Sequence, residues 1–229
     1  MRSVAVLCGL LGVGCLAEQG GTIVITGIAK PDRECSISAT GQHRLSGETF
    51  DAAGGSEYLI SPIVRNDMVD EIDNELPVDK DVVLTGFRVC WFDVLPLSGR
   101  NAFDLECDEL PSTQRAFVPV SGVVEANMGL SAVTIGVLGP EAFAALWPDG
   151  IPASATLVVQ LQAEASLKSG EGVVTSNWYP FELEVCERCI LRNLESSCGV
   201  GCIDYVKSCR PNQSGGTPLC RTNDAACGS

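Results

Sequence analysis

The chain has 229 residues, 12 cysteines and a formal net charge of −14 at pH 7. Its length allows one large β domain or two small domains, and 45% hydrophobic against 19% charged residues excludes a disordered chain. The acidic balance argues against binding to nucleic acid or to an anionic membrane surface, because both need Lys and Arg to displace counterions. The single histidine, His43, removes most metalloenzyme and histidine-base chemistry.

Residues 1–14 have the pattern of an export signal. Arg2 supplies a positive charge, and residues 4–13 form an apolar run. A run of about ten residues is too short to cross the roughly 30 Å hydrocarbon core of a bilayer. The segment is therefore expected to be a signal peptide and not an anchoring helix.

Two cleavage sites compete at the end of this signal. Residues 11–14 before Cys15 resemble a bacterial lipobox, with Gly12 where leucine is usual, which predicts a lipid anchor on Cys15. Cys15 and Ala17 instead offer small side chains at positions −3 and −1 for ordinary cleavage before Glu18. Both sites remove Cys8 and take Cys15 out of the pool of pairing thiols.

The sequence from about residue 21 to 190 has the pattern of β-strands separated by turns. Along residues 181–186, Glu182 and Glu184 alternate with apolar residues, which predicts one face toward a core and one toward water. Such strands predict a mainly β protein, an antiparallel β-sandwich of the Ig-like kind. The expected strands are 22–26, 34–38, 58–65, 82–92, 117–125, 132–138, 155–165 and 178–187.

His43 lies in a polar stretch that predicts a turn after the second strand. A catalytic triad would need a nucleophile such as Ser46 or Ser56 beside it, yet no G-x-S-x-G elbow is present. An exposed loop histidine is the favoured interpretation, so no catalytic residue is expected.

Residues 66–81 are strongly acidic and predict a solvated loop between two strands. Clustered carboxylates also suit Ca²⁺, which gives Asp67, Asp70 and Asp73 as candidate ligands. No EF-hand spacing is present, so charge that keeps the protein soluble is the favoured interpretation and no metal is expected.

Ten cysteines remain after signal removal, and an even count behind an export signal predicts disulfides. Cys90 and Cys107 lie 17 residues apart around a turn region, so a hairpin-like return would bring them together. If this pair forms, Cys35 needs a partner near the carboxyl terminus. The ten are Cys35, Cys90, Cys107, Cys186, Cys189, Cys198, Cys202, Cys209, Cys220 and Cys227.

The sequence also predicts one helix and a division into two domains. Residues 140–147 predict the only helix, with Pro140 at its start and Pro148 ending it. Residues 15–185 form the expected acidic sandwich domain, and residues 186–229 form a cysteine-rich segment with too few large apolar side chains for a core. This second segment is expected to be a disulfide-knotted tail.

Cys186-x-x-Cys189 allows two other interpretations. A redox dithiol normally opens a helix in a thioredoxin-like pattern, whereas this motif follows a strand. A zinc site would use Cys186, Cys189, Cys198 and Cys202. An oxidising compartment and three further cysteines favour disulfides over both.

The arrangement resembles a group of uncharacterised cysteine-rich lipoproteins from myxobacterial-type bacteria. The resemblance implies a cell-envelope location and a β-sandwich, and it implies no activity. The residues that carry it are 13–15, 58–68, 82–89 and 178–190.

Together these features predict an exported, lipid-anchored envelope protein with a structural, adhesive or binding role, no catalysis and no cofactor. Its location would be the outer membrane or cell surface, or alternatively the periplasm or the medium. Its partner would be an unknown envelope or extracellular component, and its only membrane contact the lipid anchor. The alternative is a calcium-dependent carbohydrate-binding or hydrolytic module.

Overall fold

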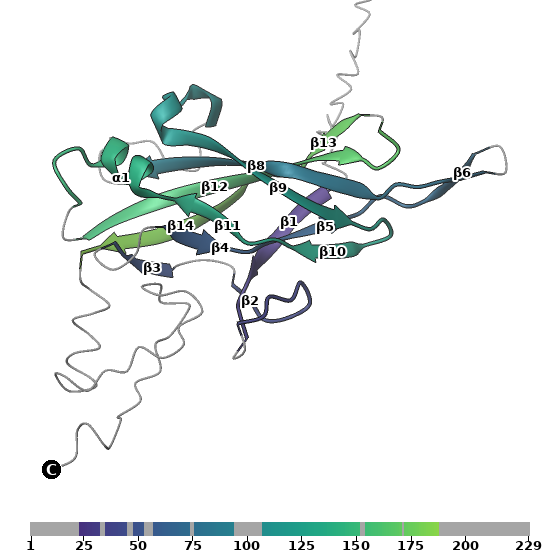
Figure 1. Ribbon diagram of the computed structural model, residues 1–229, viewed down its shortest axis with the longest axis horizontal. Coiled ribbons are helices and arrows are strands. Elements are labelled where there is room, and N and C mark those ends of the chain that lie inside the picture. Colours follow the sequence, from purple (N-terminus) through teal and green to yellow (C-terminus); the bar gives the residue numbers. More distant parts are fainter. Residues whose placement is uncertain are drawn as a thin grey trace, which may run out of the picture.

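The computed structural model describes residues 23–32, 35–44, 48–52, 57–73, 76–93, 107–151, 154–170 and 172–187. Within these ranges the protein is mainly β, with several antiparallel sheets and one α-helix (Figure 1). The predicted signal peptide, Cys15 and nearly all of the predicted tail lie outside the described residues. The division at residue 186 therefore stays a prediction.

The largest sheet has six strands. Five follow the order β3-β14-β12-β8-β9, and the sixth, β13, pairs with the part of β12 that β14 does not reach. Along its central strands β12 and β14, fully buried residues alternate with more exposed ones over part of the length, as expected for strands that are covered on one face. Their bounds are β3 Glu48–Asp51, β8 Val82–Asp93, β9 Arg115–Val124, β12 Ser154–Leu167, β13 Val173–Thr175 and β14 Tyr179–Cys186.

A second set of strands covers one face of this sheet. It comprises a four-stranded sheet in the order β10-β5-β1-β2 and the pair β11-β4. Figure 1 shows the strands between α1 at one end of the molecule and the β6–β7 hairpin at the other. The bounds are β1 Ile23–Ala29, β2 His43–Arg44, β4 Tyr58–Ile60, β5 Pro62–Asn66, β6 Glu71–Asp73, β7 Leu76–Val78, β10 Gly129–Ala132 and β11 Ile135–Leu138.

The main core lies between these two sets of strands. Alternate residues of β14 are buried, while Glu182 and Glu184 face solvent, which confirms the alternation predicted for this strand. At one end, the helix α1 (Pro140–Leu146) places Phe143 against Phe50, with ring centroids 5.7 Å apart. Members of the core that are fully buried include Ile23, Ile60, Val64, Leu84, Phe87, Leu157, Leu161 and Leu183.

Pro140 stands at the start of α1 and Glu141 in its first turn, so the predicted helix is confirmed. The strands predicted at 82–92, 155–165 and 178–187 are present with small changes at their ends. The one predicted at 132–138 is instead split, because β10 pairs with β5 and β11 pairs with β4.

The strand predicted at 34–38 is wrong for its described part, residues 35–38. The Asp32 carboxylate accepts a hydrogen bond from the Ser36 N–H at 2.8 Å, and Cys35 adopts a positive φ of 67°. A side chain that bonds the backbone of a residue nearby in the chain competes with strand pairing, so this segment turns.

Two further expectations need correction. The sheet is not wholly antiparallel, because β3 pairs with β14 in parallel from Glu48↔Leu183 to Asp51↔Cys186. Residues 66–81 are not a simple loop, since β6 and β7 form an antiparallel hairpin within them. The alternation rule missed β2, β3, β6, β7 and β13, which are all four residues long or shorter.

Candidate functional site

The densest group of polar contacts gathers where β5 ends and β8 begins. Asn66, the last residue of β5, is fully buried. Its Nδ2 donates to the carbonyl oxygens of Lys80 (2.9 Å) and Val124 (3.2 Å), and its Oδ1 accepts from the N–H of Met68 (3.0 Å). One amide thus ties together the ends of β5, β7 and β9, and satisfies backbone groups that would be costly to bury unpaired.

Asp70 joins the next layer of this group. Its Oδ1 accepts from the Lys80 N–H at 3.0 Å and its Oδ2 from Asn127 Nδ2 at 2.8 Å. The Asp70 N–H in turn donates to Asn127 Oδ1 at 3.3 Å. Asn127 has a φ of 60°, a left-handed conformation that asparagine tolerates better than most residues. The turn between β9 and β10 is therefore fixed against the segment before β6.

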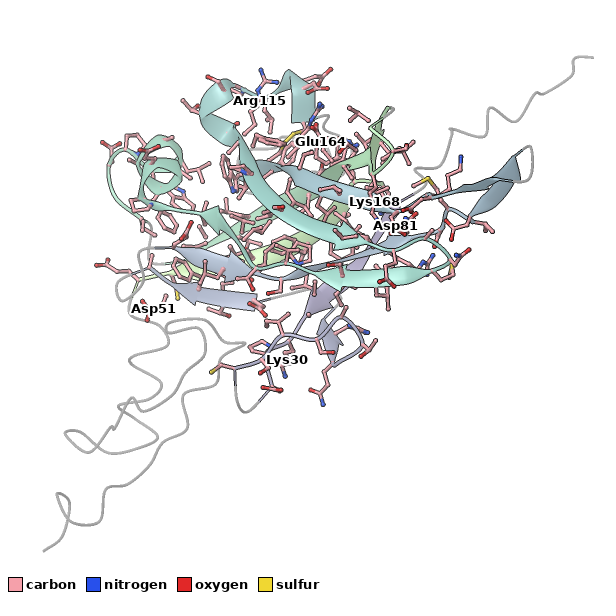
Figure 2. All side chains as sticks on the ribbon, turned by 45° about the vertical axis from the view of Figure 1, so that its right-hand side comes forward. Lys30, Asp51, Asp81, Arg115, Glu164 and Lys168 are labelled. Atoms are coloured by element: carbon pink, nitrogen blue, oxygen red, sulfur yellow. A yellow bond between two sulfur atoms is a disulfide. The ribbon has the colours of Figure 1, made fainter. Side chains whose placement is uncertain are left out.

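Lys168 brings the turn after β12 into the same group. Its ammonium contacts carboxylate oxygens of Asp79 and Asp81, each at 3.0 Å, and Figure 2 shows Lys168 beside Asp81. The second oxygen of Asp81 accepts the Ala126 N–H at 2.9 Å. These contacts join four chain segments into what we call the polar network: Asn66, Asp70, Asp79, Asp81, Asn127 and Lys168.

The contacts within the polar network shift the pKa values of Asp79 and Lys168. The backbone N–H of Asp81 and the Lys168 ammonium lower the pKa of Asp79 below its ordinary value. Asp79 and then Asp81 raise the pKa of Lys168 to about 12. Both shifts favour the charged forms, so the network is an ion-pair arrangement at neutral pH.

The polar network does not assemble the predicted calcium ligands. Arg65 holds both oxygens of Asp67, at 2.5 Å and 2.8 Å, and Asp70 already accepts two protein donors. The side chain of Asp73 lies outside the described residues. Among the residues that are described, no group of three or more His, Cys, Asp or Glu side chains is arranged to hold a metal ion.

His43 is not in a turn but in the two-residue strand β2, opposite Ala29 of β1. Its side chain is exposed, as predicted for a histidine without a catalytic role. Ser46 and Ser56 lie outside the described residues, so the structure leaves the rejected triad untested.

The predicted Cys90–Cys107 disulfide is present, with the two Cα atoms 5.8 Å apart. It lies on the face of β8 that is turned away from the main core. There it packs with buried Phe92 and Val158, and half-buried Trp178 and Leu110 flank them. We call these six residues the disulfide cluster.

Two other cysteines can be placed. Cys35 and Cys186 are also disulfide-bonded, which removes Cys186 as a thiolate ligand for zinc. The predicted pairing of Cys35 within the tail depends on residues outside the described ranges. So do the roles of Cys189, Cys198, Cys202, Cys209, Cys220 and Cys227.

Sequence reasoning missed two buried features. The first is the buried hydrogen bond that the Tyr58 hydroxyl donates to the Glu48 carboxylate at 2.7 Å. The second is the buried Asn66 amide, which organises the polar network. The uncharged Asn66, which follows the predicted strand 58–65 and stands between Arg65 and Asp67, was the available signal for a structural amide. The partner Lys168 had no local signal, because it lies 87 residues from Asp81.

No protein-family model and no curated protein sequence matches this chain. The resemblance to cysteine-rich lipoproteins therefore stays a prediction. In the part of the chain that the structure describes, no helix is both long and apolar enough to cross a bilayer. The geometry itself is that of a stabilising network, since its described carboxylates are occupied by protein donors.

Proposed function

We propose that the protein is an exported, lipid-anchored component of a bacterial cell envelope that acts by binding, without catalysis. The observation that carries the proposal is the Cys90–Cys107 disulfide, which is buried among apolar side chains of the fold. Structural disulfides persist in oxidising compartments and are rare in the cytosol. The signal-like residues 1–14 and the lipobox-like sequence before Cys15 supply the route and the anchor.

The arrangement of polar groups supports a binding role over an enzymatic one. The acids of the polar network accept backbone N–H groups or pair with Lys168, and Asp67 is engaged by Arg65. A general acid or base needs a group free to exchange a proton with a substrate. Rigid, fully engaged carboxylates suit a scaffold that presents a surface.

The finer description of the fold belongs to the same proposal. Two sets of strands with a common buried core support a β-sandwich, and an Ig-like arrangement is the proposed form of it. The parallel β3–β14 pair would then be an addition to the antiparallel pattern. Comparison of an experimentally determined structure with Ig-like domains tests this description.

Intact mass of the protein recovered from a bacterial host tests export and anchoring together. The expected species lacks residues 1–14, carries acyl chains on Cys15 and sediments with the membrane. Reduction should add the mass of two hydrogens for each disulfide. The variant Cys15→Ser is the test of the anchor, and Cys8→Ser, inside the signal, is its matched control.

The outcomes separate the parts of the proposal. A soluble species beginning at Glu18 without acyl chains would contradict the anchor and leave export standing. A cytosolic species that still begins at Met1, with Cys90 and Cys107 as free thiols, would contradict the whole proposal.

A further inference from the structure

The strand β9 ends the six-stranded sheet and has a ladder partner on one side only. It pairs with β8 from Cys90↔Arg115 to Val82↔Val124, with one register shift between Gly86↔Pro119 and Leu84↔Gly122, where two residues of β9 face one of β8. No other strand in the described ranges pairs with its second edge. At ten residues it is much longer than β3, the four-residue strand at the opposite edge of the sheet. Long open edges are rare in monomeric proteins, because their unpaired N–H and C=O groups invite another strand.

The side chains of β9 do not protect this edge with charge. Residues 116–124 carry no charged side chain in a protein of net charge −14. Even-numbered residues turn toward the main core, whereas Phe117 and Val123 are 50% and 52% exposed on the opposite face. Exposed large apolar residues on an edge strand are a recurrent mark of an interface.

The charges that flank this segment are of opposite sign. Arg115 begins β9 and Glu125 follows it, and both side chains are exposed. Among the described residues, the Arg115 side chain contacts the exposed Asp108: it lies 3.7 Å from the carboxylate and donates to the Asp108 carbonyl oxygen at 3.3 Å. Such a surface pair is weak enough to exchange for another. Figure 2 shows Arg115 at one extremity of the molecule, where a second chain could approach it.

We propose that two copies of this chain pair through β9, antiparallel and centred on Val120, so that their six-stranded sheets become one. In this register Arg115 of each copy lies opposite Glu125 of the other. Phe117 lies opposite Val123, and the four exposed apolar side chains of the two copies meet on one face. Opposite charges and apolar pairs directly across two strands are the pairs that stabilise a sheet.

The sequence of β9 also selects this register. A shift of the centre by two residues places Arg115 opposite the uncharged Ser121 in one direction, and opposite Gly129, beyond the end of β9, in the other. Pro119 has no N–H and falls opposite Ser121, so each copy forgoes one hydrogen bond at that position. A partner of unrelated sequence would not reproduce the Arg115–Glu125 complementarity twice.

Sedimentation velocity on the oxidised full-length protein tests the proposal. All samples carry Cys15→Ser, so that no acyl chain contributes to association and the outcome is independent of the proposed anchor. The protein with no change besides Cys15→Ser, called wild type in this experiment, is expected to have twice the monomer mass. Arg115→Glu and Glu125→Arg should each weaken the dimer by about tenfold or more, since each creates two like-charge pairs. The double variant Arg115→Glu/Glu125→Arg should restore it.

Glu182→Arg is the matched control, because it makes the same charge change at an exposed position on β14 of the same sheet and should leave the dimer intact. Circular dichroism and the melting temperature verify that each variant is folded. In the wild type, hydrogen exchange of residues 115–125 should slow as protein concentration rises.

Any of three results in sedimentation would overturn the proposal. They are a wild type that is monomeric at every concentration tested, a dimer indifferent to both single reversals, and a double variant no better than the singles. Protection that appears on another strand in place of β9 would also do so.

Discussion

The two ends of β8 are held in different ways. At its Val82 end the polar network joins four chain segments through amides, carboxylates and Lys168. At its Cys90 end the disulfide cluster holds the neighbouring segment by a covalent bond and apolar packing. One end therefore depends on protonation and the other on oxidation, although both anchor the same strand of the same sheet.

The two ends of β8 are held by different interactions because their surroundings differ. The polar network lies where turns meet, and turns bring many backbone N–H and C=O groups that need partners. The disulfide cluster lies on the outer face of a sheet, where a few apolar side chains alone would give a small core. A cross-link there limits the freedom of the unfolded chain as well as holding the native one.

The largest expected effect comes from removing the cross-link. The double variant Cys90→Ala/Cys107→Ala should lower the free energy of unfolding by about 3 kcal/mol, because 17 residues separate the two cysteines. Urea unfolding under non-reducing conditions measures the change. A loss below about 1 kcal/mol would show that packing, and not the bond, holds this end.

Removing the central amide of the polar network should have a somewhat smaller effect. Asn66→Ala deletes three hydrogen bonds and leaves the carbonyls of Lys80 and Val124 without this donor, at a cost of about 2 kcal/mol. The matched control is Asn127→Gly, which removes an exposed amide and keeps the positive φ of that turn. Equal losses for the two variants would contradict the central role of Asn66.

Lys168→Met should lower stability only slightly at neutral pH, because the Lys168 and Asp79 side chains are about half exposed to solvent. The effect should depend on pH in a defined way. The folded pKa of Asp79 is lowered, so its contribution is present above its ordinary pKa of 3.8 and is lost as pH falls further. The folded pKa of Lys168 is raised, so its contribution is present below 10.5 and is lost as pH rises through about 12.

The stability difference between wild type and Lys168→Met should therefore be constant between roughly pH 5 and 9 and shrink beyond both limits. Paired urea titrations across this range measure it. A difference that persists in strong acid would assign the effect to packing of the lysine stem instead of its charge.

The smallest expected effect is that of calcium, for which no change is expected. A filled site would add roughly 2.7 kcal/mol at 100 times its dissociation constant. Asp67 and Asp70 already accept protein donors, so addition of calcium after chelation should leave the melting temperature unchanged. A rise would revive the calcium-dependent alternative.

Local pattern was enough to predict much of the fold. Alternation located β12 and β14, and Pro140 located α1, because these signals act within a few residues. The turn at Asp32 and Ser36 was missed, since a side-chain hydrogen bond outweighed an alternating pattern. The shortest strands offered too few residues for any period to be recognised.

The polar network was only half predictable. Acidic residues 66–81 stood out, but their partners did not. Asn127 is 57 residues from Asp70, and Lys168 is 87 residues from Asp81. Contacts at such separations depend on which strands become neighbours, and an alternation pattern carries no information on sheet order.

The parallel pairing of β3 with β14 has a consequence for the order of assembly. Thr49 in β3 and Glu184 in β14 share a hydrogen bond across 135 positions of the chain. During synthesis from the amino end, β3 must wait for almost the whole described chain before its partner emerges. Closing so long a loop is slow relative to forming a hairpin. We therefore expect β8 and β9 to pair early and β3 to dock last, so that the arrival of β14, the last strand of the described residues, is the step that completes the sheet.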